Sequence, residues 1–313
     1  MKKQSYDLIG DIHGQAPELV RLLEKLSYLN IDGVWQHTER KVIFLGDFVD
    51  RGDYQREVID IVRPMVDNGY ALSVMGNHEY NAIAYYTKNK KGEYLRSHND
   101  KHTKQHKAFL TAYAGDSNEK KGVIEWFKTL PLWLDLDGLR VVHACWDFNL
   151  ISKVGKSVLT DDLLQQSSIK DTWQYDAIET LLKGKEIPLP NGQSFLDKDG
   201  NSRRHIRTRW WDTKAKTYKQ VFFGPDDALT HIPDDSVIGD HLIDYAYDNK
   251  PVFLGHYWMK GDIQPLADNI ACLDYSVADA KDPNARLVAY RWDGEQKIDT
   301  DRFVFVNRKS TVV

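Results

Sequence analysis

Three short polar motifs in the first third of the chain contain the residue types that bind divalent metal ions. The motifs are Gly-Asp-Ile-His-Gly at residues 10–14, Gly-Asp-Phe-Val-Asp-Arg-Gly at 46–52 and Gly-Asn-His-Glu at 76–79. Carboxylates, imidazoles and amide oxygens are common ligands of such ions, and glycines allow the backbone to pack closely around them. Asp11 and His13 alternate along the chain, so on an extended backbone both point to the same side. The motifs therefore predict a metal site.

Each motif directly follows a short apolar run, and two further apolar runs end in the same way, at His143 and at His256. In open α/β sheets ligands bind beyond the carboxyl ends of the strands, so we expect these polar clusters to converge. Asp47 has two carboxylate oxygens and can bridge two ions at the separation of roughly 3.5–4 Å that two-metal hydrolases use. The sequence thus predicts a two-metal centre with Asp47 between the ions.

Each motif taken alone also has a structural explanation. Asp-x-His is compatible with a turn, Asp-Arg with a surface ion pair and Asn-His with a helix cap. The occurrence of all three motifs at strand ends, in this order, favours the functional interpretation.

On these motifs the chain resembles the calcineurin-like metallophosphoesterases, most closely the branch of phosphoprotein phosphatases, symmetric dinucleoside tetraphosphatases and the phosphatase module of bacterial RNA-end-healing enzymes. The matching motifs lie between residues 10 and 257. The resemblance implies a four-layer αββα sandwich with two mixed sheets and inserted segments. It implies two divalent metal ions, with Mn(II) expected ahead of Fe and Zn because mixed Asp, His and Asn ligands discriminate weakly. It assigns one metal to Asp11, His13 and Asp47, and the other to Asp47, Asn77, His143 and His256.

Residues beside these ligands are candidates for catalysis and substrate binding. Arg51 offers a planar fork of donors for two phosphoryl oxygens. The resemblance implies that His78 pairs with Asp50 and donates a proton to the leaving oxygen, and the alternative is that His78 orients the metal-bound water. Asp274 either faces the substrate, as the resemblance implies, or caps the end of its strand.

Two positions depart from the pattern of the family. His143 is followed by Ala144 and Cys145, where phosphoprotein phosphatases usually have two glycines, so we expect a different substrate groove. Position 258 is Trp, where many wider members of the family have a second histidine. The first metal is therefore expected to have fewer protein ligands and more room for water.

Two further clusters have alternative interpretations. His98, His102 and His106 recur at four-residue spacing, but the flanking lysines predict a solvated face that would repel a cation, which disfavours a third metal site. Residues 203–209 contain four arginines. This run either supplies a second phosphate-binding arginine or forms a strand with one charged face. Residues 197–200 are interpreted as a turn rather than a calcium loop.

The elements that must position these residues follow from hydrophobic spacing. Strands are expected at 6–9, 42–45, 70–75, 139–142, 252–254 and 270–273, with a closing hairpin of 287–292 and 303–306. Leucines from Leu19 to Leu29 and apolar residues from Val58 to Val66 have helical spacing. Alternating strands and helices predict an α/β sandwich with parallel pairing in the first half. We interpret residues 1–313 as one domain with insertions at about 88–125, predicted on the surface, and about 150–250.

Composition excludes several classes of protein. The chain has 313 residues, of which 42% are hydrophobic, enough for one large globular domain or at most two. Its net charge of -4 argues against stable nucleic-acid binding. Cys145 and Cys272 form no Cys-x-x-Cys pair, which disfavours a disulfide framework or a zinc ribbon. With neither a signal peptide nor an apolar stretch of about 18 residues, a cytoplasmic location without membrane association is expected.

The expected function is hydrolysis of phosphate monoesters by attack of a metal-bridging hydroxide, with phosphorylated proteins or small phosphate esters as substrates. The alternative keeps the metals but cleaves dinucleoside tetraphosphates, RNA ends or 2',3'-cyclic phosphates. A third hypothesis is an inactive binding module, which the complete ligand set disfavours. The oligomeric state is not predicted.

Overall fold

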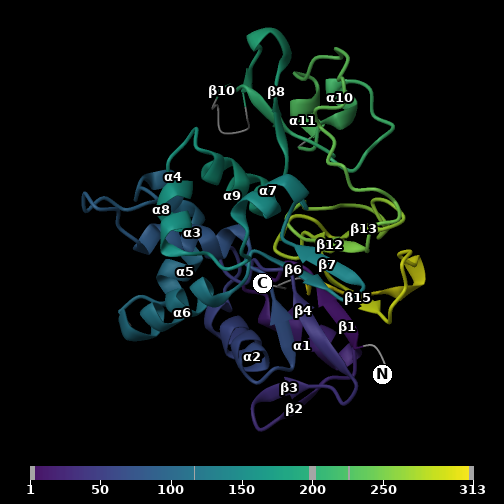
Figure 1. Ribbon diagram of the computed structural model, residues 1–313. Coiled ribbons are helices and arrows are strands. Elements are labelled where there is room, and N and C mark those ends of the chain that lie inside the picture. The colour runs from purple at the N-terminus through teal and green to yellow at the C-terminus, as the bar shows by residue number, and fades with distance from the viewer. Residues whose placement is uncertain (1–3, 116, 197–201, 225, 310–313) are drawn as a thin grey trace.

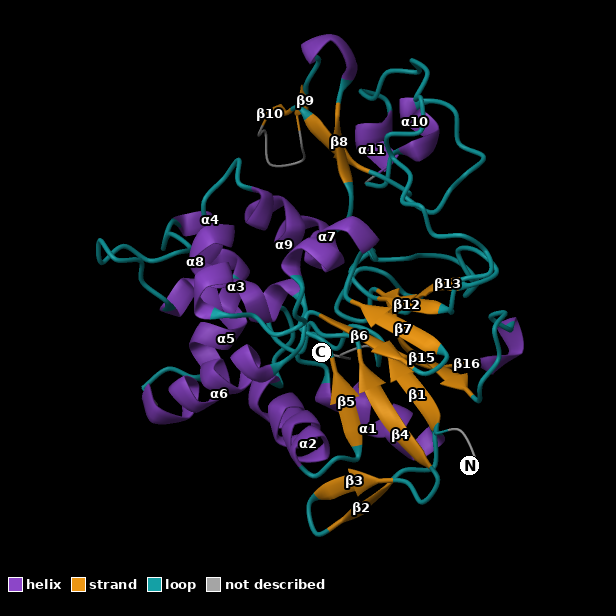
Figure 2. Ribbon diagram, viewed as in Figure 1, coloured by secondary structure: helices purple, strands orange, loops and turns teal. Residues whose placement is uncertain are grey.

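The computed structural model describes residues 4–115, 117–196, 202–224 and 226–309. Two large β-sheets lie against each other, with helices gathered on one side and a smaller group of elements at one end (Figures 1 and 2). The turn expected at residues 197–200 lies outside the described residues. In the described part of the chain, no helix combines the length and apolar character needed to cross a membrane.

The larger sheet has six strands and carries the first three motifs. Its order is β14-β15-β1-β4-β5, with β16 paired to β15. β1, β4 and β5 are parallel, and β15 is antiparallel to its neighbours β1, β14 and β16. The strands are β1 (Ser5–Ile9), β4 (Arg40–Phe44), β5 (Ala71–Ser73), β14 (Asp274–Tyr275), β15 (Arg286–Trp292) and β16 (Phe303–Asn307). Ile9 is level with Phe44, and Phe44 with Ser73, so the three parallel strands end at the same edge.

The second sheet has four strands in the order β13-β12-β7-β6. β12 is parallel to both β7 and β13, whereas β6 and β7 form an antiparallel hairpin. The strands are β6 (Trp133–Leu136), β7 (Leu139–Val142), β12 (Val252–Leu254) and β13 (Ile270–Cys272). The expected strands are thus found, and both sheets are mixed, as predicted.

Alternate residues of the strands form two hydrophobic cores. Leu8 and Ile43 of the larger sheet pack with Val141 and Phe253 of the smaller sheet, so this core lies between the sheets. The intervening residues face the helices. This second core joins Ile9, Val42, Phe44, Val142 and Leu254 to apolar residues of α1 (Ala16–Lys25), α2 (Gln55–Asp67) and α9 (Trp173–Lys183). The layered α/β architecture expected from the sequence is therefore confirmed.

The chain passes from one sheet to the other at Leu273, between β13 and β14. The backbone there approaches β1 so closely that a Cβ atom at Gly10 would lie 2.1 Å from the carbonyl oxygen of Leu273. Only glycine fits at this crossing.

Helix α1 ends earlier than its leucine spacing predicts. Leu19, Leu22 and Leu23 are buried on one face, and Pro17 lies in the first turn, where a missing N–H costs nothing. After Lys25 the chain turns at Ser27, which has a φ of +69°. Leu29 is 65% exposed and starts a hairpin of β2 (Leu29–Ile31) and β3 (Val34–Gln36), so its expected place in the helix is wrong.

The segment expected as a surface insertion at about 88–125 is only partly on the surface. Its lysines from Lys88 to Lys107 are exposed, but Phe109, Tyr113 and Val123 are buried in the main core. The segment follows α3 (Asn77–Tyr86) and contains α4 (Asp100–Gln105), α5 (Lys107–Ala112) and most of α6 (Ser117–Thr129). This segment therefore helps to build the region around the metal motifs.

A smaller core lies within the second inserted segment. Ile187, Ile206, Val221 and Phe222 pack together apart from the two main cores, and Figure 2 shows their elements beyond the large sheets. The remaining elements of the chain are α7 (Phe148–Val154), α8 (Asp161–Ser167), β8 (Glu186–Pro188), η1 (Pro190–Gly192), β9 (Phe195–Leu196), β10 (Ser202–Arg203), β11 (His205–Arg207), α10 (Tyr218–Val221), α11 (Asp226–Leu229) and η2 (Thr300–Arg302).

Candidate metal centre

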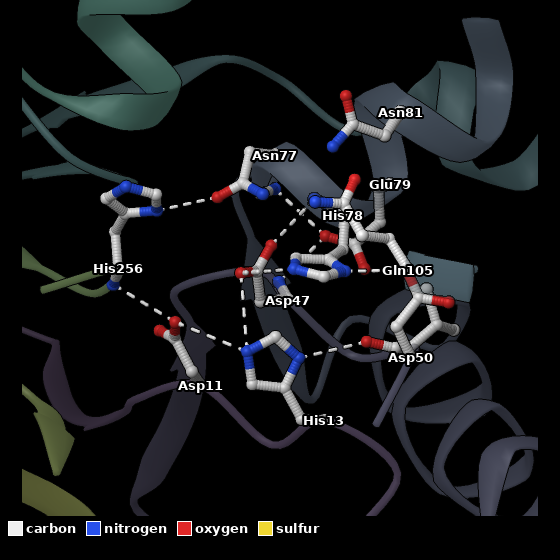
Figure 3. A network of polar contacts seen from close by, with 12 residues as sticks. Asp11, His13, Asp47, Asp50, Asn77, His78, Glu79, Asn81, Gln105 and His256 are labelled. Atoms are coloured by element: carbon white, nitrogen blue, oxygen red, sulfur yellow. Dashed lines mark hydrogen bonds and ion pairs between the residues drawn. The ribbon is translucent and has the colours of Figure 1, made fainter. Parts of the chain in front are cut away.

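The six side chains predicted as metal ligands come from five loops that begin where strands end. Asp11 and His13 follow β1, Asp47 follows β4, Asn77 starts α3 after β5, His143 follows β7 and His256 follows β12. Figure 3 shows five of them pointing toward one another around Asp47. The two sheets thus contribute to one centre, as the positions of the motifs predict.

Asp47 lies in the middle of this centre. Its Oδ2 atom is 3.5 Å from Nε2 of His13 and 3.4 Å from Nε2 of His143. Two groups of donor atoms share Asp47, each within 4.8 Å: one adds His13 and His78, and the other adds His143 and His256. Asp47 therefore has the shared position that a bridging carboxylate needs.

Asn77 and Asp11 complete the set. Oδ1 of Asn77 lies 2.6 Å from Nδ1 of His256 and 3.3 Å from Nε2 of His143. Oδ2 of Asp11 accepts the backbone N–H of His256 at 3.0 Å and lies 4.0 Å from Nε2 of His13. A Cβ atom at residue 255 would lie 2.0 Å from Oδ1 of Asp11, so glycine is required there.

Three buried polar atoms at this centre have no hydrogen-bond partner in the described structure. They are Oδ1 of Asp11, Nε2 of His13 and Nε2 of His256. A buried polar atom without a partner costs about 1–3 kcal/mol, so such atoms are rare unless they bind a ligand. Carboxylate oxygen and imidazole nitrogen are donors suited to divalent Mn, Fe and Zn. The residues present therefore fit a metal centre.

Two of the candidate histidine ligands are oriented by hydrogen bonds from Nδ1, the ring nitrogen that does not face Asp47. Nδ1 of His13 donates to the carbonyl of Val49 at 3.0 Å, and Nδ1 of His143 donates to the carbonyl of Leu45 at 2.6 Å. In a neutral imidazole, a ring nitrogen that donates in this way leaves Nε2 with a free lone pair for a metal. Burial would lower the pKa of His143, but the carboxylate of Asp47 outweighs it and raises that pKa to about 10, so a metal at His143 would displace a proton.

The loops hold these side chains in unusual backbone conformations. His13, Asp47 and His256 have φ values of +46°, +53° and +72°. Residues other than glycine seldom adopt positive φ, and they retain it at functional sites where the surrounding structure enforces it. The loop after β4 repeats the feature at Asp50 and Arg51, with φ of +67° and +72°.

Electrostatics keep Asp47 ionised and two histidines neutral. Burial alone would raise the pKa of Asp47, but the imidazoles of His143 and His78 outweigh it and hold that pKa well below its usual range. Burial and the nearby Arg51 lower the pKa of His13 to about 3. Burial likewise holds the pKa of His256 well below its usual range. Carboxylate and neutral imidazole are the forms that bind metal.

His78 forms the expected pair with Asp50. Its Nδ1 atom lies 2.6 Å from Oδ2 of Asp50, and its Nε2 atom lies 4.0 Å from Oδ2 of Asp47. Burial would lower the pKa of His78, but the carboxylates of Asp47 and Asp50 outweigh it and raise that pKa. His78 is thus suited to carry a proton beside the metal ligands.

Two residues near the centre were missed by reasoning from the sequence. Glu79 is buried and accepts the backbone N–H groups of Asp47, Phe48 and Gly76 at 2.7, 2.8 and 3.0 Å. It therefore fixes the loop that carries Asp47, and its place in the third motif was the available signal. His106 is the second, with Nδ1 at 2.8 Å from Oδ1 of Asp50.

The three histidines at four-residue spacing have different environments. His106 is buried, so the expectation that it lies on a solvated face is wrong. His98 stacks between the rings of Tyr85 and Tyr94, at centroid distances of 3.7 and 4.0 Å. His102 is partly exposed and bonds to Ser97. The three rings do not converge on one point in the described structure.

Arg51 and Asp274 both contact Trp258. The guanidinium carbon of Arg51 lies 4.0 Å from the ring centroid of Trp258, a cation–π contact. Asp274 is buried and accepts the backbone N–H groups of Trp258 and Ser276 at 2.8 and 3.0 Å. These contacts connect Asp274 to the loop after β12 and to the residue that follows its own strand.

One arginine of the 203–209 run lies near the centre. Arg207 is the last residue of β11, and its charge contributes to lowering the pKa of His256. It is partly buried, and its Nε atom has no partner in the described structure. Arg203, Arg204 and Arg209 are exposed.

Comparison with known proteins adds a family and several relatives. The model of the calcineurin-like phosphoesterase family matches residues 6–257. The bis(5'-nucleosyl)-tetraphosphatase PrpE (asymmetrical) of Oceanobacillus iheyensis is 33% identical over 157 residues, which cover 49% of this chain and 61% of that protein. The protein of the same name from Bacillus subtilis is 43% identical over 75 residues, covering 24% of this chain and 31% of that one. The chain thus aligns with less than two thirds of either relative.

The similar solved structures have lower sequence identity to this chain. A cold-active protein-tyrosine phosphatase of a psychrophilic Shewanella has a TM-score of 0.48 and 17% identity, with 94% of this chain and 80% of that chain covered. A protein serine/threonine phosphatase from Saccharomyces cerevisiae has a TM-score of 0.49 and 15% identity, with 96% and 78% covered. Both scores are low, so the family assignment depends on the sequence match.

Proposed function

The chain belongs to the calcineurin-like phosphoesterase family, and we propose that it is a two-metal hydrolase of phosphate monoesters. Phosphorylated proteins and small phosphate esters are the proposed substrates. The observation that carries this proposal is the set of unpartnered buried atoms on Asp11, His13 and His256 around the ionised Asp47.

The proposed ligand set keeps the division made from the sequence. Asp11 and His13 bind one ion, Asn77, His143 and His256 bind the other, and Asp47 bridges them. When bound, two divalent ions stabilise phosphoryl charge and supply a water acidic enough to lose a proton near neutral pH. Mn(II) is the proposed metal, with Fe and Zn as alternatives that the same donors accept.

The protein residues around the ions have separate tasks in this proposal. Arg51 binds two phosphoryl oxygens through its planar fork of donors, and Arg207 adds a second cation from β11. His78 donates the proton on Nε2 to the leaving oxygen while Asp50 holds its Nδ1. Asp274 acts on the substrate through the Trp258 loop that it anchors.

A second candidate function has support from the relatives. The tetraphosphatase name of the Oceanobacillus protein, at 33% identity over half of this chain, favours hydrolysis of dinucleoside tetraphosphates by the same centre. RNA ends and 2',3'-cyclic phosphates remain in this second class. The net charge of -4 argues against stable binding to nucleic acid in either case.

A substrate panel distinguishes the candidates. Purified protein with Mn(II) is assayed against an aryl phosphate, a phosphopeptide, diadenosine tetraphosphate and a 2',3'-cyclic nucleotide, and kcat/KM is compared. Monoesterase function predicts the highest kcat/KM for the first two. Preference for the dinucleotide would select the second candidate, and no turnover of any phosphate ester would contradict both.

We also propose a cytoplasmic location. Cys145 and Cys272 are both buried as free thiols, a state that suits a reducing compartment.

A further inference from the structure

The structure shows an unusual arrangement beside the metal centre, in which one carboxylate contacts two imidazoles. Asp50 is 2% exposed. Its Oδ2 atom lies 2.6 Å from Nδ1 of His78, and its Oδ1 atom lies 2.8 Å from Nδ1 of His106. His78 alone would satisfy the role of Asp50 in the proposed reaction, so the second imidazole requires an explanation.

We propose that His106 is a positioning residue for the phosphoester hydrolysis proposed above: its Nδ1–H fixes the plane of the Asp50 carboxylate, which in turn aims His78 at the leaving group. This inference rests on the proposed function. It assigns a task to the segment between α3 and α5, which belongs to none of the motifs that define the centre.

The direction of the hydrogen bonds follows from the charge of Asp50. Burial would raise the pKa of Asp50, but the hydrogen bonds of His106 and His78 outweigh it and hold that pKa well below its usual range. An ionised carboxylate has no proton to donate, so both imidazoles donate from Nδ1. His106 therefore has its proton on the nitrogen that faces Asp50.

The second donor, the Nδ1–H of His106, restricts the terminal torsion of Asp50, which a single donor would leave free to vary. The terminal torsion of an aspartate carboxylate has a broad, roughly two-fold distribution, so a single bond at Oδ2 permits the group to rock. A donor at Oδ1 removes that freedom. Since Asp50 sets the orientation of the His78 ring, fixing the carboxylate also fixes where Nε2 of His78 points.

The surroundings of His106 hold its ring in one place. It lies at the joint between α4 and α5, where its backbone N–H donates to the carbonyl of His102 at 3.1 Å. Its ring stacks on Phe109 at 4.7 Å and 17°, and the rings of Tyr85 and Tyr86 lie at 5.3 and 6.1 Å.

Packing alone does not require an imidazole at this position. Nε2 of His106 is buried without a partner in the described structure, so Nδ1 makes the only polar contact that the ring has there. A phenyl ring would suit the aromatic surroundings and would carry no polar atom of its own, but it would remove the donor to Oδ1 of Asp50. The polarity of residue 106 is therefore explained by Asp50.

The test compares two amides that differ by one methylene group. In His106→Asn the side-chain amide can donate from nearly the place of Nδ1, whereas in His106→Gln it reaches toward the place of Nε2. His106→Phe keeps the aromatic packing and removes the donor. His102→Ala, one turn earlier and not in contact with Asp50, is the matched control.

The main readout is kcat for two phosphate monoesters with leaving groups of different basicity, p-nitrophenyl phosphate and phenyl phosphate, with bound manganese measured for each variant. A poorer leaving group needs the proton of His78 more. We expect His106→Gln and His106→Phe to lower kcat about tenfold for phenyl phosphate, a fraction of what general acid catalysis contributes, and by less for p-nitrophenyl phosphate. KM and bound metal should stay unchanged, and His106→Asn should recover most of the loss.

A second readout does not depend on activity. In metal-free protein labelled with 15N-histidine, the strongly hydrogen-bonded Nδ1–H protons of His78 and His106 should give two protected low-field proton resonances. His106→Phe should remove one and shift the other, because the remaining bond to Asp50 changes its geometry.

Equal losses for both leaving groups, loss of metal in His106→Phe, or no difference between the Asn and Gln variants would overturn the role of His106 while leaving the proposed function in place. A wild-type protein that hydrolyses no phosphate ester would overturn both.

Discussion

Asp7 and Asp11 lie four residues apart along the same stretch of chain, and both are buried, but their surroundings are opposite. Asp7, in β1, accepts the Nε–H of Arg40 at 3.0 and 2.9 Å, the hydroxyl of Tyr28 at 3.1 Å and the Nε–H of Arg291 at 3.2 Å. Asp11, just past the end of β1, has one oxygen without a partner in the described structure.

The difference between Asp7 and Asp11 shows how a buried carboxylate can be interpreted from its hydrogen-bond partners. The cluster around Asp7 satisfies its own polar atoms, so it needs nothing further and holds β1, β4 and β15 together. The cluster around Asp11 leaves donor atoms unpaired in strained loops, which makes sense only with a ligand. Burial alone does not distinguish Asp7 from Asp11, whereas the unpaired oxygen of Asp11 does.

The largest effect is expected at the metal centre. Asp47→Asn removes one charge from the shared ligand and should lower kcat by about 10³-fold or more, beyond the loss typical of one electrostatic stabiliser. Metal per chain, measured by mass spectrometry, should fall as well. Wild-type activity at full metal content would contradict the assignment.

At the Asp7 cluster we expect a loss of stability without a loss of activity. Asp7→Asn leaves the guanidinium of Arg40, which is 9% exposed, without its buried counter-charge. Because a buried ion pair that loses one partner is strongly destabilised, we expect the free energy of unfolding in urea to drop by about 3 kcal/mol. The kcat of the folded fraction should not change. A variant that keeps its stability but loses activity would remove the distinction drawn between the clusters.

Arg51→Ala separates substrate binding from metal binding. Without the guanidinium fork, the phosphoryl group loses its alignment, and we expect kcat/KM to fall by about 10²-fold. Both metals should remain bound. Arg51→Lys, which keeps the charge but not the fork, should recover only part of the activity. Loss of metal in either variant would mean that Arg51 supports the ligands instead.

The smallest effect concerns the exposed rim of the Asp7 cluster. Burial would raise the pKa of Asp293, but hydrogen bonds from Arg40 and Arg302 outweigh it and lower that pKa to about 2. A carboxylate with a depressed pKa stabilises the fold above its usual pKa, and that contribution is lost as the pH falls from about 4 toward 2. Since Asp293 is 43% exposed, solvent screening should limit the effect to below about 1 kcal/mol.

Urea unfolding at several pH values checks this last expectation. The difference in free energy of unfolding between wild type and Asp293→Asn should be constant above pH 5 and should shrink on acidification. A difference that grows on acidification would show that the charge of Asp293 does not stabilise the fold.

The positions of the ligand motifs could be predicted because each is local in sequence. Asp11, Asp47 and Asn77 directly follow apolar runs, and parallel strands bring the ends of such runs to one edge. The bridging role of Asp47 stays a prediction, which its central position among the donor atoms suits. The layered α/β fold followed from the same runs.

The contacts of His106 could not be predicted in this way. Its bond to Asp50 joins residues 56 positions apart, and it depends on how two short helices meet after an irregular segment. The lysines around it predicted a solvated face, and they are indeed exposed. Only the buried packing of Phe109 and Tyr113 turns residue 106 inward. The early end of α1 was missed for a similar reason, because the turn at Ser27 interrupts a leucine pattern that continues to Leu29.

The crossing of the chain between the two sheets has a mechanical consequence. Leu273 joins a strand of one sheet directly to a strand of the other, and its carbonyl lies against Gly10, next to Asp11. A hinge that separated the sheets would have to break this crossing. This link, which lies beside Asp11, therefore limits how far the two sheets that carry the donor loops can separate.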